Sequence, residues 1–206
     1  MNEKFYTLPE EKQQKILNAA MEVFASHEYK RASTDDIAAK AGVSKGLIFY
    51  YFHNKKELYL YLYQYVAEVM KKSIVNQDFK NITDFFELLE YSAGEKVKIL
   101  EKNPYIMDFA VKTFYSEKED VSEDLQQYTT SQMTIMYDEY LKNLDLYKFK
   151  EEAEPMYIYR MLVWMADGYM HQLKMINQPI ELKSMMKEFK QWMTMLRQLT
   201  YKEEYL

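Results

Sequence analysis

Residues 33–58 read STDDIAAKAGVSKGLIFYYFHNKKEL, and this stretch decides the fold. Ser33 and Thr34 carry hydroxyl groups of the kind that cap helix N-termini, and apolar residues follow them at helical spacing. Gly42 then stands where a helix ends in the left-handed conformation that glycine adopts most readily. Ser44 can cap a second short helix. The stretch therefore predicts two short helices joined by a tight turn, which is a helix-turn-helix.

A further helix is expected before this stretch, over about residues 8–27. Thr7 and Glu10 fit a capping box around Pro9, and Pro9 suits the first turn of a helix. Apolar residues then recur at helical spacing along one face: Ile16, Ala19, Ala20, Val23 and Phe24. The first 53 residues therefore predict three short helices.

The rest of the chain predicts longer helices and no sheet. Only four glycines and four prolines occur in 206 residues, too few for an all-β fold or a glycine-rich parallel α/β sheet. We expect helices at roughly 55–76, 82–102, 104–116, 122–144, 154–177 and 180–202, with loops at 116–124 and 145–154. The fold class is therefore all-α, with about nine helices. We expect two domains, residues 1–54 and residues 55–206.

Charge is distributed unevenly along this acidic chain, whose net charge is −5. Residues 1–56 carry nine Lys or Arg and seven Asp or Glu, a net charge of +2, whereas residues 57–206 carry −7. Residues 37–56 contain four lysines and no acid. This asymmetry favours a local surface that faces phosphate groups.

Several protein classes are excluded by composition. The chain has no cysteine, which excludes disulfides, cysteine-ligated zinc and a cysteine nucleophile. The N-terminal residues contain no apolar stretch typical of a signal peptide, and no uncharged apolar run approaches the ~18 residues that span a bilayer. We therefore expect a cytoplasmic protein without cofactors.

The second short helix of the motif has the properties of a DNA-reading helix, which enters the major groove by its N-terminal end. Gly46 has no Cβ, so the backbone can approach DNA closely there. Lys45 can reach a guanine edge or a phosphate. Thr34, Ser44 and Lys55 can bind the DNA backbone through hydroxyl or ammonium groups. Tyr50 and Tyr51 provide ring surface with a hydroxyl group at the tip.

This segment closely resembles the DNA-binding segment of the TetR family of bacterial repressors. The resemblance rests on Ala41–Phe52 with Lys55 and Leu58, and on the apolar start of the first helix. It implies that Lys45 and Gly46 approach bases and that the other candidates hold the DNA backbone. Three residues depart from the family pattern: Leu47 replaces Thr or Asn, Phe49 replaces Tyr, and Tyr51 replaces His. These departures make the operator sequence unpredictable.

The resemblance also implies that residues 55–206 bind a small effector and form a homodimer. The 20 Tyr, 15 Met and 11 Phe residues lie mostly after residue 57 and suit an apolar pocket, although ordinary helix packing explains any single one. Asp108 is a candidate polar anchor. The expected ligand-binding residues are Tyr91, Met107, Asp108, Phe114, Met133, Tyr137, Trp164 and Met165. The last two helices are expected to form the dimer, with Gly168 allowing a close approach, so that a twofold protein reads a near-palindromic operator.

Two other classes of function remain as alternatives. A helical-bundle enzyme or metal protein would need motifs that are missing, such as GxSxG, a P-loop, GxGxxG, HExxH or Glu-x-x-His pairs. Asp167 and His171 lie four residues apart and could form half of a metal site, but a structural hydrogen bond is the simpler explanation. A protein-interaction scaffold would show no salt-dependent DNA binding, whereas a repressor would.

Overall fold

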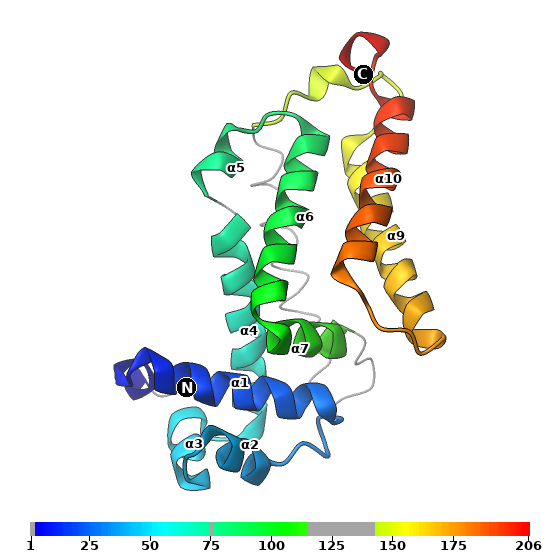
Figure 1. The fold of residues 1–206 in the computed structure, drawn as a ribbon. Helices are drawn as coiled ribbons and strands as arrows, with labels where there is room; N and C mark the ends of the chain where they lie inside the picture. Colours follow the sequence, from blue (N-terminus) through cyan, green and yellow to red (C-terminus); the bar gives the residue numbers. More distant parts are fainter. Residues whose placement is uncertain (1–2, 75, 115–142) are drawn as a thin grey trace. The chain divides into compact units, whose positions relative to one another are not determined.

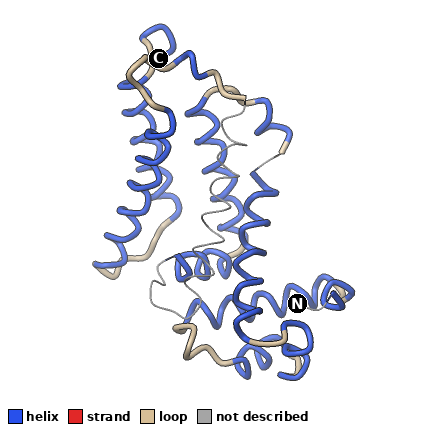
Figure 2. The backbone as a smooth tube through the Cα atoms, turned by 180° about the vertical axis from the view of Figure 1, so that it is seen from behind, coloured by secondary structure: helices blue, strands red, loops and turns tan. Residues whose placement is uncertain are grey.

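The structure is a computed structural model that describes residues 3–74, 76–114 and 143–206. It confirms the all-α fold, because these residues form helices and loops and no β-strand (Figures 1 and 2). Nine α-helices are described: α1 (Glu10–Ser26), α2 (Thr34–Ala41), α3 (Lys45–Phe52), α4 (Lys55–Ile74), α5 (Gln77–Asn81), α6 (Phe85–Lys102), α7 (Pro104–Phe114), α9 (Pro155–Met175) and α10 (Leu182–Thr200). Three 3-10 helices accompany them: η1 (Glu3–Thr7), η2 (Leu146–Lys148) and η3 (Glu203–Tyr205).

The predicted helices are confirmed to within three residues at each end wherever the structure describes them. Three details were wrong. The five-residue helix α5 was not expected, because a single turn has no periodicity to read. The loop predicted at 145–154 contains η2 and a single β-bridge between Phe149 and Tyr201. Thr7 does not cap α1, since its hydroxyl donates to the Lys4 carbonyl at 2.8 Å. The helix expected at 122–144 lies outside the described residues.

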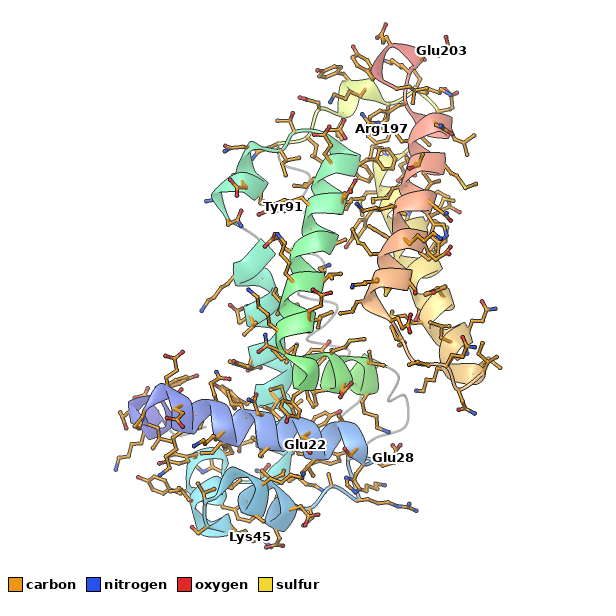
Figure 3. The ribbon with its side chains drawn as sticks, in the orientation of Figure 1. Glu22, Glu28, Lys45, Tyr91, Arg197 and Glu203 are labelled. Carbon is orange, nitrogen blue, oxygen red and sulfur yellow. The ribbon has the colours of Figure 1, made fainter. Side chains whose placement is uncertain are left out.

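The first compact unit comprises the described residues within Met1–Lys72 and Lys102–Tyr137. Within it, α1 lies between α2 and α7 (Figure 1). Phe24 of α1, Tyr59 of α4 and Phe109 of α7 are buried together, with ring centroids 4.9 Å apart for Phe24–Tyr59 and 5.3 Å for Tyr59–Phe109. Lys112 of α7 also pairs with Glu28, which follows α1 (Figure 3). The three helices that contain the motif therefore share a core with α4 and α7.

The second compact unit comprises the described residues within Ser73–Glu101 and Asp138–Leu206. Its helices α9 and α10 pack against each other. Each contributes buried apolar side chains to the core: Ile158, Leu162, Met193 and Leu196. Tyr201, directly after α10, is buried against Phe86 of α6 and Phe149. The division at residue 54 separates predicted functions rather than packing units, and it stays a prediction. None of the described helices is both long and apolar enough to span a membrane.

Replacing Gly42 with alanine is expected to lower the free energy of unfolding by about 1–2 kcal/mol. Gly42 adopts φ 67° and ψ 33°, and its N–H caps α2 by donating to the Ala38 and Ala39 carbonyls. An added Cβ would meet no atom within 4 Å, so the loss would come from the backbone conformation alone. Urea denaturation followed by circular dichroism measures it. Gly94→Ala, inside α6 with equally open space and no positive φ, should instead stabilise by up to about 1 kcal/mol. Equal effects of both variants would contradict the conformational explanation.

Candidate nucleic-acid interface

The motif has the geometry of a helix-turn-helix. The Ser33 hydroxyl accepts from the N–H groups of Asp35 at 3.1 Å and Asp36 at 3.4 Å, which fixes the start of α2. Gly42 ends α2 in the left-handed conformation. The Ser44 hydroxyl then accepts from the Leu47 N–H at 3.2 Å and starts α3. Two capped helices joined by a left-handed glycine confirm the arrangement that the sequence predicts.

The N-terminal end of α3 is exposed to solvent, and one of its residues has no side chain. Ser44, Lys45 and Gly46 are all exposed. A Cβ on Gly46 would find its nearest heavy atom, the Ser44 hydroxyl oxygen, 3.9 Å away. The absence of a side chain at Gly46 is therefore not required by packing within the protein. It leaves helix backbone open to a close approach by another molecule, at a helix end whose N–H groups favour anionic or hydrogen-bond-accepting partners.

Lys45 lies at the start of α3 (Figure 3), and its ammonium is paired with Asp35. The Nζ–Oδ2 distance is 2.7 Å, and both side chains are exposed. The same nitrogen lies 6.0 Å from the centre of the Phe49 ring. Asp35 was not among the predicted site residues. One sequence feature could have identified Asp35: it is an acidic residue in the first turn of α2, the helix that precedes the recognition helix. The helix dipole also favours an acid at that position.

The two tyrosines of α3 differ sharply in exposure. Tyr50 is 45% exposed, and the Lys4 ammonium lies 5.8 Å from the centre of its ring. Tyr51 is only 6% exposed and packs edge-on against Phe5 at 5.6 Å. Tyr50 therefore presents its ring to solvent as a DNA contact requires, whereas the ring of Tyr51 belongs mainly to the core.

Lys55 anchors the connection between α1 and α2. Its ammonium donates to the carbonyls of Tyr29 at 2.7 Å and of Lys30 and Ala32 at 3.2 Å each. It also lies 4.6 Å from the centre of the Tyr29 ring. An ammonium has three donors, and three carbonyls accept from them here. This geometry gives Lys55 a structural role, and its predicted contact with the DNA backbone stays a prediction.

The N-terminal segment η1 packs against α3, a contact that the sequence analysis did not predict. Phe5 is fully buried and lies 4.9 Å from the Phe52 ring and 5.9 Å from the Tyr61 ring, between centroids. An isolated Phe ahead of the first predicted helix carries no periodicity, so only the packing reveals it. Of the remaining predicted residues, Thr34 is half-buried at the start of α2. Leu47 and Phe49, which depart from the family pattern, are half-buried along α3.

The predicted ligand-binding residues are distributed over both compact units. Tyr91 of α6 and Asn76 exchange hydrogen bonds at 2.7 and 2.9 Å, and Trp164 and Met165 lie on α9. Met107 and Asp108 lie on α7 in the other unit, half-buried and exposed respectively. The side chain of Phe114 is not described, and Met133 and Tyr137 lie outside the described residues. The ligand site therefore stays a prediction.

The described residues hold no group of three or more His, Cys, Asp or Glu side chains placed to bind a metal ion. Asp167 and His171 lie one turn apart on α9, as their spacing requires, and each takes part in an interaction within the protein. Within the part of the chain that the structure describes, the half-site suggested by these two residues is not completed.

The chain is similar in sequence to bacterial transcription regulators. A family model described as "Bacterial regulatory proteins, tetR family" matches residues 16–62. The transcriptional activator FasR of Mycolicibacterium smegmatis is 30% identical over 110 residues, which are 48% of this chain and 49% of FasR. The fatty acid metabolism regulator protein of Bacillus subtilis is 30% identical over 91 residues, 44% of this chain and 39% of that protein. The chain thus aligns with less than half the length of these curated relatives.

Solved structures resemble the chain over nearly its full length. SmeT in complex with triclosan has a TM-score of 0.72 at 19% identity, covering 94% of this chain and 93% of that one. The regulator FadR of Bacillus subtilis in complex with stearoyl-CoA has a TM-score of 0.65 at 17% identity, covering 87% and 96%. These likenesses support the fold, and the family model covers the helix-turn-helix whose geometry is described above. Residues 16–62 thus match the DNA-binding segment of the tetR family of bacterial regulatory proteins, and the whole described chain has the fold of regulators of that family.

Proposed function

We propose that the protein is a ligand-responsive transcription regulator that represses its target genes by binding a near-palindromic operator as a homodimer. The observation that carries this proposal is the exposed start of α3, where Ser44, Lys45 and Gly46 present a cation, free N–H groups and bare backbone. A recognition helix contacts base edges in the major groove with residues at its N-terminal end. The protein would act in the cytoplasm, where bacterial operators lie, and without catalysis.

The proposed effector is a mostly apolar small molecule. Support comes from two kinds of observation. The chain beyond residue 57 is rich in Tyr, Met and Phe, residue types that line apolar pockets. Two structural neighbours are complexes with molecules that have large apolar parts, SmeT with triclosan and FadR with stearoyl-CoA. Such a ligand would release the operator only if it binds the DNA-free conformation more tightly than the DNA-bound one.

The proposed dimer surface is an apolar stripe on α9 and α10. On α9, Tyr157, Trp164 and Met175 are exposed at spacings that place them on one face, together with Gly168. The Tyr157 and Trp164 rings contact each other edge-on at 6.1 Å. On α10, Met195 and Leu199 are exposed one turn apart. A run of large apolar side chains on adjacent helices is typical of an interface rather than of a monomer's surface.

Replacing Trp164 with glutamate is expected to convert the dimer into a monomer at micromolar concentration. Trp164 is 56% exposed in the single chain, so the change should leave the fold intact while placing a charge in an apolar interface. Size-exclusion chromatography with light scattering measures the mass, and circular dichroism checks the fold. Trp164→Phe, which keeps an apolar ring, should remain dimeric. A dimeric, folded Trp164→Glu variant would argue against this surface.

The DNA-binding part of the proposal is tested by selecting bound sequences from a random duplex library with the purified protein. The expected result is a near-palindromic sequence whose affinity, measured by fluorescence anisotropy, falls steeply between 50 and 200 mM salt, as for other proteins that contact several phosphates. A folded, dimeric sample that enriches no sequence and binds no duplex at low salt would overturn it. Candidate apolar ligands are then titrated into the complex, and a ligand that binds equally well with and without operator is not the effector.

A further inference from the structure

Asp35, in the first turn of α2, and Lys45, the first residue of α3, bring an acid and the lysine of the recognition helix together. Ser33 fixes the first turn of α2 and the turn at Gly42 fixes the direction of α3, so the two backbones hold both side chains in reach of each other. The ammonium and the carboxylate are 2.7 Å apart. Both side chains remain about half or more exposed, at 48% for Lys45 and 66% for Asp35. The pair therefore lies on the surface that the proposed function assigns to DNA.

The carboxylate affects anionic and neutral partners of Lys45 differently. A phosphate that approaches the ammonium also approaches Asp35, and two negative charges a few ångströms apart repel each other. A guanine edge presents the neutral acceptors O6 and N7, which the carboxylate does not repel in this way. An ammonium has three donors, so Lys45 can keep its bond to Asp35 and still donate to a guanine. The pair thus favours a base contact over a phosphate contact.

We propose that Asp35 is a specificity-determining residue of the DNA interface, which weakens binding of Lys45 to phosphate groups more than its binding to base edges. This inference rests on the proposed function and deepens it. Sequence-independent binding depends almost entirely on phosphate contacts. Base contacts, in contrast, provide discrimination. The consequence is a protein that binds DNA less tightly overall than its lysines would allow and distinguishes its operator better.

The test compares Asp35→Asn with the wild-type protein on two duplexes of equal length, the sequence selected from the random library and a shuffled version of it. Asparagine keeps the size of the side chain and removes the charge. Affinity for the shuffled duplex should rise about five- to tenfold, the size of one close charge effect near a surface. Affinity for the selected duplex should rise less than about threefold, because its base contact is already compatible with the carboxylate. Discrimination between the two duplexes therefore falls.

Asp36→Asn is the matched control, because Asp36 is the next residue, also exposed and of the same charge. It should raise the affinities for both duplexes by a similar and smaller factor. In a Lys45→Gln background, Asp35→Asn should no longer alter discrimination, since its effect acts through Lys45. The inference is overturned if Asp35→Asn and Asp36→Asn behave alike, or if the change persists without Lys45. A wild-type protein that binds neither duplex would overturn the proposed function as well. Failure of the Asp35 inference alone is therefore distinguishable from failure of the proposed function.

Discussion

Replacing Gly46 with alanine is expected to weaken binding to the selected operator about tenfold or more, while the protein folds at least as stably as before. Within the chain the added methyl group makes only an ordinary van der Waals contact, since its nearest heavy atom, the Ser44 hydroxyl oxygen, would lie 3.9 Å away. Alanine also has the higher helix propensity, by up to about 1 kcal/mol. On DNA, the same methyl group would stand between the start of α3 and the groove floor. Each hydrogen-bonded contact between the protein and a base that the methyl group prevents would cost about 1–3 kcal/mol of binding free energy.

Two measurements separate weakened binding from damage to the fold. Urea denaturation should show unchanged or increased stability for Gly46→Ala, and anisotropy should show the weakened operator complex. Affinity for the shuffled duplex should fall less, because phosphate contacts do not require the closest approach. Tight operator binding by Gly46→Ala would mean that α3 does not approach the bases at its N-terminal end. The assignment of the reading end would then have to be abandoned.

The helix-turn-helix could be predicted from sequence because local rules determine it. Ser33, Gly42 and Ser44 act on N–H and carbonyl groups within a few residues of themselves, and the structure shows each of them doing so. The face to which a side chain of α3 turns is not a local property. Tyr50 and Tyr51 are adjacent and chemically identical, yet Phe5, from a segment far earlier in the chain, buries one and not the other.

Lys55 illustrates the same difficulty for charged residues. A lysine at the start of a helix beside a DNA-binding motif could hold a phosphate or could hold the protein's own backbone. The sequence favours neither, because the carbonyls of Tyr29, Lys30 and Ala32 come near its ammonium only through the packing of α4 beside the α1–α2 connection. The partner of the Lys55 ammonium is therefore determined by long-range packing, which local sequence patterns do not predict.

Asp84 is the clearest case of a residue whose role only the tertiary structure reveals. It caps α6, with one carboxylate oxygen accepting from the N–H groups of Phe86 at 3.0 Å and Glu87 at 3.1 Å. The other oxygen lies 2.9 Å from the Lys148 ammonium and 3.7 Å from the Arg197 guanidinium. Asp84 is 3% exposed. One buried carboxylate thus joins α6, η2 and the end of α10 in the second unit.

The pKa of Asp84 follows from these contacts. Burial alone would raise it, but the hydrogen bonds from Lys148 and from the Glu87 N–H, with the charge of Arg197, outweigh burial and hold the pKa below its usual value of 3.8. The hydrogen bond to Asp84 in turn raises the pKa of Lys148 above its usual value of 10.5. A carboxylate with a lowered pKa stabilises the folded state above about pH 4. This contribution is lost as the pH falls through the lowered value.

Replacing Asp84 with asparagine is expected to lower the free energy of unfolding at pH 7 by about 2–3 kcal/mol. Asparagine can still cap α6 through its amide oxygen, so the loss isolates the charge. Breaking a buried pair costs about 3–5 kcal/mol when the remaining charge is fully buried, and Lys148 and Arg197 here are 19% and 34% exposed, which moderates the cost. Urea denaturation at fixed protein concentration measures the difference. Asp78→Asn, at an exposed position of α5, should change stability by less than about 0.5 kcal/mol.

The pH dependence of this difference distinguishes the ion pair from simple packing damage. Between about pH 5 and pH 9 both partners are charged, so the gap between wild type and Asp84→Asn should stay constant. Below pH 4 the wild-type carboxylate begins to take up its proton, and the gap should shrink until the two proteins unfold alike. It should also shrink in strongly alkaline solution, once the pH passes the raised pKa of Lys148. A gap that stays the same down to pH 3 would show that the difference in stability does not come from the charge of Asp84.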